Sequence, residues 1–195
     1  NIQFYNFYHD KNYNLKKLNE FEKNINTSNF TNSYLQFLTE FLAKYIHQYK
    51  ALPKILDIGG DFGGNHLYLK KIFEKEIVYD ILETETRVKL SKKNLNFTNY
   101  FSNFSEIKNE YYDIVYSSGT IQYTENYHDT LNSIFQINPK FIVLVRNNFG
   151  ENGIISAQYT PDGYTPNQQV SFKKLEEMIN KYSYKILRKI NIQKQ

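Results

Sequence analysis

Apolar residues recur along the chain with two different periods, and the change of period divides the chain into two parts. Near the start they recur every three or four residues, which predicts helices at about residues 10–24 and 33–50 after an aromatic stretch at 1–9. From residue 54 onward, short apolar runs alternate with helical patterns. Continuous apolar runs are typical of parallel strands, because both faces of their sheet are covered. The pattern therefore predicts an α/β protein.

The second part predicts strands that are separated by helices. Strands are expected at residues 54–58, 76–82, 96–101, 112–116 and 141–145, and one or two more at 182–192. Helices are expected at residues 65–73, 85–93, 124–137 and 171–180. Strands that alternate with helices form βαβ units, and these give a parallel sheet with helices on both faces. We therefore expect a three-layer, Rossmann-like fold with a mostly parallel central sheet and a helical extension at the N-terminus.

One segment, residues 147–170, breaks the alternation. It is long, polar and aromatic, and its sequence predicts neither a helix nor a strand. A structureless loop of this length in a compact domain is usually functional, so we expect it to contact a substrate. Neither a repeat nor a linker interrupts the chain, which predicts a single domain over residues 1–195. Within it, residues 1–52 would cover the active site and residues 53–195 would form the core.

Composition narrows the function classes. The 195 residues contain no cysteine, which excludes a disulfide scaffold, a thiolate nucleophile and a cysteine-bound metal. Histidines and carboxylates do not show the spacing of metal ligands, and the longest apolar run is too short to span a membrane. The net charge is +4, but the lysines are scattered, which argues against a nucleic-acid partner. A cytoplasmic protein fits this composition.

Four glycines directly follow the first strand of the alternating part. They are Gly59, Gly60, Gly63 and Gly64. Glycine adopts positive φ and lets a ligand approach the backbone, and the N–H groups at the start of a helix can bind that ligand. Ligands of open α/β sheets bind at the carboxyl ends of the strands. The sequence therefore predicts a site for a nucleotide-like molecule at this turn.

Two acidic residues suggest which nucleotide-like molecule binds. Asp57 precedes the glycines, and Asp80 lies near the end of the second strand. An acid in the second position can bind both hydroxyls of a ribose. An acid in the first position would attract an ammonium group, whereas a pyrophosphate has no use for it. S-adenosylmethionine carries both groups, and NAD stays as the alternative although the glycines lack the Gly-x-Gly-x-x-Gly spacing.

Four segments occur in the order found in class I S-adenosylmethionine-dependent methyltransferases, namely residues 55–64, 79–85, 112–123 and 142–146. The chain resembles this superfamily over about residues 50–150. More narrowly, the Asp-x-Gly-Gly turn, the later Ser-Ser-Gly-x-x-Gln-Tyr and the strand-end Arg146 look like a bacterial group of methyltransferases associated with surface-polysaccharide genes. The resemblance implies a methyltransferase fold, S-adenosylmethionine as cofactor and S-adenosylhomocysteine as product. The spacing of histidines and carboxylates argues against a metal.

The cofactor-binding residues that the resemblance implies follow the ends of the first four strands. They are Asp57, Gly59, Gly60 and Gly63, then Asp80 and Ile81, then Phe101, Ser102 and Asn103, and finally Ser117 and Ser118. The first group would line the methionine and back the ribose, and the second would bind the ribose and adjoin the adenine. The third group would edge the adenine, and the fourth would contact the methionine. Asp61 stands where this family more commonly has a glycine.

The exit of the fourth strand bears on the methyl acceptor. Residues 117–120 lack the Asn/Asp-Pro-Pro-aromatic motif of enzymes that methylate exocyclic nucleobase amines. A small acceptor is the better expectation, and the narrower resemblance implies O-methylation of a sugar or sugar derivative, for example a sugar nucleotide, in surface-glycan biosynthesis. Alternatives are a non-catalytic methyltransferase-like subunit, an NAD- or nucleotide-sugar-binding enzyme, and a nucleic-acid methyltransferase.

Candidate catalytic and acceptor-binding residues lie on the same face. His66 and His128 each open a helix there and could act as the base that deprotonates an alcohol, or could be ordinary helix-start residues. Arg146 could hold a phosphate or carboxylate of the acceptor, or pair with a neighbouring acid. The remaining candidates have surfaces suited to a sugar, although tyrosine is also a common packing residue; they are Gln122, Tyr123, Tyr159 and Tyr164.

Overall fold

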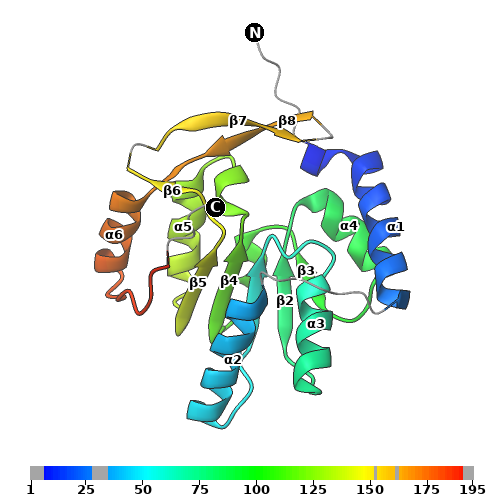
Figure 1. Ribbon diagram of the computed structural model, residues 1–195, viewed down its shortest axis with the longest axis horizontal. Helices are drawn as coiled ribbons and strands as arrows, with labels where there is room; N and C mark the ends of the chain where they lie inside the picture. Colours follow the sequence, from blue (N-terminus) through cyan, green and yellow to red (C-terminus); the bar gives the residue numbers. More distant parts are fainter. Residues whose placement is uncertain (1–6, 28–34, 152, 161–162, 191–195) are drawn as a thin grey trace.

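A computed structural model describes residues 7–27, 35–151, 153–160 and 163–190 of the protein (Figure 1). Several sequence expectations lie outside these residues: most of the aromatic stretch at 1–9, the first two positions of the helix expected at 33–50, and the end of the strand expected at 182–192. None of the helices within the described ranges is both long enough and apolar enough to cross a membrane.

Five parallel strands form the central sheet in the spatial order β3-β2-β1-β4-β5. The strands are β1 (Ile55–Ile58), β2 (Tyr79–Leu82), β3 (Asn99–Phe101), β4 (Ile114–Ser118) and β5 (Phe141–Val145). The first strand, β1, lies in the middle of the sheet. β2 and β3 follow towards one edge, and β4 and β5 then lie on the other side of β1. Ligands of open α/β sheets bind where the strand order reverses, which here is between β1 and β4. The predicted α/β fold with a parallel sheet is confirmed.

Helices cover both faces of the sheet. The α-helices are α1 (Lys11–Thr27), α2 (Gln36–Tyr49), α3 (Gly64–Phe73), α4 (Glu85–Asn94), α5 (Tyr127–Gln136) and α6 (Phe172–Lys181). Short 3-10 helices are η1 (Phe7–His9), η3 (Phe104–Ile107) and η4 (Ile121–Tyr123). All six α-helices lie where the sequence predicted helices. The start of α5 differs, because Asn126 rather than Thr124 caps it by accepting bonds from the N–H groups of residues 128 and 129.

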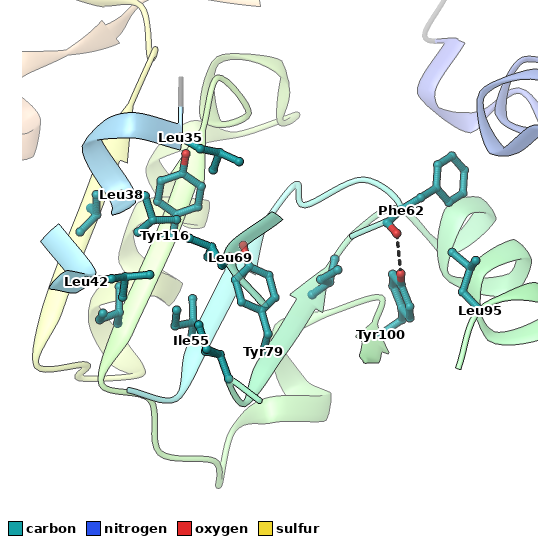
Figure 2. Packing of buried hydrophobic residues seen from close by; sticks show 14 of the residues in the cluster. Leu35, Leu38, Leu42, Ile55, Phe62, Leu69, Tyr79, Leu95, Tyr100 and Tyr116 are labelled. Carbon is teal, nitrogen blue, oxygen red and sulfur yellow. Dashed lines mark hydrogen bonds between the residues drawn. The ribbon is translucent and has the colours of Figure 1, made fainter. Parts of the chain in front are cut away.

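Two hydrophobic clusters hold these layers together, one on each side of the sheet. Ile55 and Leu56 are neighbours in β1 and both fully buried, yet they belong to different clusters. This follows from the alternation of side chains along a strand. The first cluster joins the sheet to α1, α2, α3 and α4, and Figure 2 shows part of it. The second joins the sheet to η3, α5 and α6.

Residues 147–170 form strands, so the prediction of a structureless loop was wrong. β7 (Ile155–Thr160) and β8 (Gly163–Gln168) pair as an antiparallel hairpin. Its base is closed by the short parallel pair of β6 (Phe149–Gly150) and β9 (Val170–Ser171). The described side chains of β7 are all exposed, so the hairpin lacks the alternation that identifies a half-buried strand. In Figure 1 the hairpin extends above the sheet towards α1.

The strand predicted at residues 182–192 is absent from the described part, which ends at residue 190. Tyr182 stacks on Phe135 at the end of α5, and the Tyr184 ring meets the same Phe135 edge-on. These aromatic contacts hold the tail against α5 rather than in register with β5. A groove of about 770 Å³ lies beside β5, between α2, α6 and the tail.

The register aligns the carboxyl ends of the strands. Ile58 of β1 lies opposite Leu82 of β2 on one side and Ser117 of β4 on the other. Leu82 in turn lies opposite Phe101 at the end of β3, and β5 ends at Val145 opposite Ser118. The residues that follow these positions therefore meet at one edge of the sheet, which we call the carboxyl edge.

Candidate functional site

The glycine turn between β1 and α3 has no room for side chains at three positions. Gly59 has a φ of +76°, and a Cβ there would lie 2.0 Å from the Thr120 hydroxyl oxygen. Gly63 has a φ of +87°, and a Cβ there would lie 2.8 Å from the Phe97 ring. At Gly60 the obstacle would be the Asp57 carboxylate, at 2.8 Å. The glycines thus allow the turn to fold tightly between β2 and β4.

The Asp57 carboxylate lies beneath this turn and is only 1% exposed. Its Oδ2 accepts hydrogen bonds from the Tyr79 hydroxyl at 2.6 Å and the Asn65 amide at 2.9 Å. Burial raises the pKa of Asp57 to about 6, although both hydrogen bonds act in the opposite direction. Asp57 therefore ties the turn to β2 and α3, and it contributes negative potential below the backbone of the turn.

Asp80 lies inside the sheet rather than at the carboxyl edge, which corrects its expected position. It is the second residue of β2 and lies opposite Leu56, two residues before the end of β1. Its carboxylate accepts bonds from the Asn99 amide at 2.8 Å and the Tyr112 hydroxyl at 2.9 Å. The Lys54 ammonium lies 3.7 Å away. Lys54 and Tyr112 precede β1 and β4, so Asp80 points towards the amino ends of the strands.

Glu83 is the acid that stands at the carboxyl end of β2. It directly follows Leu82, whose carbonyl accepts a 2.8 Å bond from the Gly59 N–H, so it lies beside the glycine turn. Its side chain is 6% exposed. Oε2 accepts a 2.6 Å bond from the N–H of Thr84, and Oε1 lies 2.8 Å from Arg87 Nη1. A carboxylate in this position can bind the two hydroxyls of a ribose.

The glycine turn and Glu83 share one cation. Nη1 of Arg87 on α4 also lies 3.3 Å from Oδ1 of Asp61, the residue that replaces the more common glycine. Asp61 adopts a φ of +52°, which directs its carboxylate to α4. The Phe62 carbonyl accepts a 3.0 Å bond from the Tyr100 hydroxyl, shown as a dashed line in Figure 2. Both contacts fix the turn to neighbouring elements.

Of the residues expected around an adenine, one lies in the hydrophobic core and the others lie at the carboxyl edge. Ile81 is fully buried in the first hydrophobic cluster, so its side chain forms core rather than a pocket wall. Phe101 ends β3 at the carboxyl edge. Ser102 and Asn103 follow it, and both bond to Glu106, where Asn103 caps η3. The loop after β3 is therefore held in a fixed shape beside Glu83.

The exit of β4 lies against the glycine turn. Ser117 is fully buried, and its hydroxyl donates a 3.2 Å bond to the Ile58 carbonyl. Ser118 ends the strand, and its carbonyl accepts a bond from the Thr120 hydroxyl at 3.4 Å. Thr120 is also the residue that contacts Gly59. These links keep the backbone after β4 close to the backbone after β1.

The two candidate histidines occupy different environments. His66 is 3% exposed and stacks on the Tyr79 ring with 5.1 Å between centroids. Burial lowers the pKa of His66, and its position in the core gives a small acceptor no access to it. The side chain of His128 is 51% exposed in the first turn of α5, next to the exit of β4. Only His128 of this pair is thus placed where it could meet an acceptor.

The expected acceptor residues lie on η4, at the exit of β5 and on the hairpin. Gln122 is buried and donates a 3.4 Å bond to the Arg146 carbonyl, so it joins η4 to β5. Arg146 itself is exposed. The Tyr123 hydroxyl donates a 2.5 Å bond to the Gln158 side chain, which ties η4 to β7. This arrangement brings Tyr123, Arg146 and the hairpin to the carboxyl edge.

Tyr159 and Tyr164 meet edge-on across the hairpin, with 5.3 Å between ring centroids. They are 71% and 47% exposed, so they form an open aromatic surface. Tyr8 of η1 lies at the carboxyl edge, with its ring 5.8 Å from that of Tyr123. Burial raises the pKa of Tyr8 to about 12. The ring of Tyr8 thus links the N-terminal residues to η4.

Sequence reasoning missed four residues at this edge: Glu83, Arg87, Tyr8 and Asn14. Glu83 could have been found, because it is the first polar residue after the apolar run of β2 and precedes Thr84, the residue directly before α4. Arg87 lies four positions after Glu83, a spacing at which two side chains can pair, so that contact could also have been found. The roles of Tyr8 and Asn14 could not, because they depend on contacts between segments that are far apart in the sequence.

No protein-family model matches the chain, and no curated protein sequence matches it. Solved structures with low sequence identity do resemble it. The plantazolicin methyltransferase BpumL, in complex with a pentazolic desmethylPZN analog and SAH, is 18% identical with a TM-score of 0.42, over 64% of this chain and 51% of that one. The N-terminal domain of EvdMO1 with SAH bound is 10% identical with a TM-score of 0.46, over 74% and 70%.

The CMeT domain of the citrinin polyketide synthase is 16% identical with a TM-score of 0.46, over 57% of this chain and 34% of that one. The present chain thus spans about half the length of the BpumL chain and about a third of the CMeT domain chain.

Proposed function

We propose that this protein is an S-adenosylmethionine-dependent methyltransferase that acts in the cytoplasm on a small hydroxylated acceptor. The observation that carries the proposal is the position of Glu83. A buried carboxylate ends β2 directly beside a glycine turn that follows β1, in a sheet of order β3-β2-β1-β4-β5. A ribose bound to Glu83 would place its attached groups over the turn and over the loop after β3.

The charges at this edge favour a cationic cofactor over a pyrophosphate. Asp57, Asp61 and Glu83 surround the turn, and Arg87 is the cation that Asp61 and Glu83 share on the side of α4. A pyrophosphate would be repelled by this group of carboxylates. The ammonium and sulfonium of S-adenosylmethionine would be attracted. The glycines let the turn pack closely against Thr120, Asp57 and Phe97, which keeps its backbone between β2 and β4 at the carboxyl edge.

In this proposal the protein contributes to catalysis more by positioning the acceptor than by transferring a proton. S-adenosylmethionine supplies an activated methyl group, and much of the acceleration can come from holding an acceptor in line with it. In this proposal Tyr123, the hairpin and Arg146 would hold the acceptor. His128 would accept a proton from an acceptor hydroxyl. The finer proposal is a sugar or sugar derivative of surface-glycan biosynthesis, which is supported by the sequence resemblance and by the exposed tyrosines of the hairpin.

The proposal is tested by isothermal titration with S-adenosylhomocysteine. We expect the wild-type protein to bind it and Glu83→Gln to lose about 10- to 100-fold in affinity, since a hydrogen bond to a charged group contributes about 1.5–3 kcal/mol. Asp80→Asn is the matched control, because Asp80 is a carboxylate of the same strand that points away from the carboxyl edge. We expect it to bind with near wild-type affinity.

Two results would contradict the proposal. If the wild type binds NAD but not S-adenosylhomocysteine, the alternative cofactor is correct. If Asp80→Asn loses affinity and Glu83→Gln does not, the ribose acid has been assigned to the wrong residue. The acceptor class is then tested by a screen of sugars and sugar nucleotides for gain of a methyl group, with Arg146→Ala as a variant that should weaken acceptors carrying phosphate.

A further inference from the structure

Arg87 is a buried cation that joins three parts of the molecule. Its side chain is 7% exposed. Nη1 lies 2.8 Å from Glu83 at the end of β2 and 3.3 Å from Asp61 in the glycine turn. Nε donates a 2.8 Å bond to the side-chain oxygen of Asn14 on α1. One guanidinium therefore contacts both acidic loops of the proposed cofactor site and the N-terminal helix.

This guanidinium stays charged and is held in a fixed position. Burial opposes its charge, but Glu83 and Asp61 outweigh burial and raise the pKa of Arg87. Aromatic rings enclose it as well, with Tyr8 at 5.3 Å and Phe62 at 5.8 Å from the guanidinium carbon. A planar guanidinium can satisfy several acceptors at once in a way that a lysine cannot.

Asn14 carries the contact into the N-terminal residues. It is fully buried, and its amide donates to the Tyr8 carbonyl at 2.9 Å and the Asp10 carbonyl at 2.7 Å. Asn14 thus binds the start of α1 and η1 to each other and presents its oxygen to Arg87. We call residues 7–27, which comprise η1 and α1, the N-terminal segment.

We propose that Arg87 is a positioning residue that holds Glu83 for the cofactor ribose and couples cofactor binding to docking of the N-terminal segment. The inference rests on the proposed function. A carboxylate can accept about four hydrogen bonds. Arg87 donates a hydrogen bond to Oε1 of Glu83, and the N–H of Thr84 donates one to Oε2. These two bonds fix the plane of the carboxylate. Each oxygen can still accept a hydrogen bond from a ribose hydroxyl.

Asp61 fits the same scheme. A positive φ is uncommon for residues other than glycine, although aspartate tolerates it better than most. At this position the conformation brings the carboxylate to Arg87, so the turn gains an ion pair that a glycine could not make. Without Arg87, the carboxylates of Asp61 and Glu83 would repel each other, and Glu83 would lose its fixed orientation.

A double-mutant cycle tests whether Arg87 acts through Glu83. Affinity for S-adenosylhomocysteine is titrated for the wild type, Arg87→Met, Glu83→Gln and the double variant. We expect each single change to weaken binding about tenfold or more. Because Arg87 acts through Glu83, the double variant should lose no more than Glu83→Gln alone. Losses that multiply, or wild-type affinity in Arg87→Met, would overturn the inference while leaving the proposed function intact.

Two further variants separate positioning from simple destabilisation. Arg87→Lys keeps the charge and should fold, but it cannot hold both carboxylates and Asn14, so we expect it to bind more weakly than the wild type. Lys89→Met removes an exposed cation from the same helix and should bind normally. If Arg87→Lys binds as tightly as the wild type, the geometry of the guanidinium has no role and the inference is wrong.

Hydrogen exchange tests the coupling to the N-terminal segment. We expect S-adenosylhomocysteine to slow exchange in residues 11–27 of the wild type. Asn14→Ala removes the link between Arg87 and this segment but leaves Glu83 in place. It should still bind the ligand, and the ligand should no longer protect residues 11–27. Protection that survives in Asn14→Ala would show that the coupling does not pass through Arg87. A wild type that fails to bind at all would instead refute the proposed function and, with it, this inference.

Discussion

Asp57 lies next to the last residue of β1 with its carboxylate inside the protein. Its burial and its hydrogen bonds shift its pKa in opposite directions. Burial raises the pKa of Asp57 to about 6, whereas the donors Tyr79 and Asn65 favour the ionised form. The unfolded chain has an ordinary aspartate with a pKa near 3.9. The folded protein therefore binds an additional proton between about pH 4 and pH 6.

The stability of the protein should fall across this interval. A raised pKa means that the contribution of Asp57 is fully present below about pH 4 and is lost as the pH rises through 6. The difference of about two pH units corresponds to about 3 kcal/mol of unfolding free energy. Chemical denaturation of the wild type and Asp57→Asn from pH 4 to pH 7.5 measures it. We expect the wild type to lose about that amount relative to Asp57→Asn.

The exposed Asp129→Asn serves as the control and should follow the wild-type curve. Parallel curves for the wild type and Asp57→Asn would show that Asp57 titrates normally in the folded protein.

From the sequence, single residues were predicted correctly where only one residue type suits the backbone. They were predicted wrongly where the direction of a side chain decides its role. The glycines after β1 were identified because few residues tolerate positive φ. Asp80 and Glu83 lie three positions apart, the first inside β2 and the second at its exit, and spacing alone favoured the first. The side chain of Asp80 is drawn to Lys54 and Tyr112, which lie 26 and more positions away in the chain. Sequence spacing contains no information about that pairing.

The hairpin of β7 and β8 depends on the rest of the molecule for its position. An isolated two-stranded hairpin is marginally stable in water. Gln168 at its base donates to the carbonyls of Thr124 and Glu125 at 2.7 and 3.0 Å. Tyr123 and Gln158 provide a second link further along the hairpin. The loop between η4 and α5 therefore sets where the hairpin stands over the carboxyl edge.

Loss of the first link should loosen the hairpin without unfolding the protein. Gln168→Ala removes two hydrogen bonds of about 1 kcal/mol each, so amide exchange in residues 155–160 and 163–168 should quicken about fivefold or more. The melting temperature should change little. Gln136→Ala, an exposed glutamine at the end of α5, is the control and should leave exchange unchanged. Equal exchange in the two variants would mean that Gln168 does not anchor the hairpin.

Whole elements were predicted well wherever burial imposes a clear period. All five strands of the parallel sheet and all six α-helices were expected at nearly their observed positions, because each must present an apolar face to the sheet or the core. The hairpin was missed because most of its side chains are exposed and impose no such period. The tail after α6 was wrongly predicted as a strand, since its alternating residues instead place Tyr182 and Tyr184 against α5.

At the scale of the molecule, one sheet is shared by two cores. Leu42 of α2 and Leu131 of α5 are both fully buried, but they lie in clusters on opposite faces. Every strand of the sheet contributes side chains to at least one of these clusters, and β1 contributes to both. Neither cluster can be lost without exposing the sheet that supports the other. The protein should therefore unfold as one cooperative unit.

Two cavity-forming changes test this. Leu42→Ala and Leu131→Ala should each lower the unfolding free energy by about 2–5 kcal/mol. Each should shift a single transition seen alike by far-ultraviolet circular dichroism and by tyrosine fluorescence. Leu187→Ala, which truncates a leucine that is 65% exposed, should change stability by less than about 0.5 kcal/mol. Two separate transitions in either core variant would show that the two faces unfold independently.

The bond between Asn14 and Arg87 also has a consequence for biosynthesis. The two residues are 73 positions apart, so a ribosome that adds about 5–20 residues each second makes Arg87 roughly 4–15 seconds after Asn14. During that delay α1 has neither its polar partner nor α4 to pack against, and most of the stability of a helix in a protein comes from tertiary packing of its apolar face. α1 therefore cannot complete its packing until α4 has been synthesised. Chaperones would meet the nascent chain with its N-terminal apolar side chains, such as Leu18 and Phe21, still uncovered.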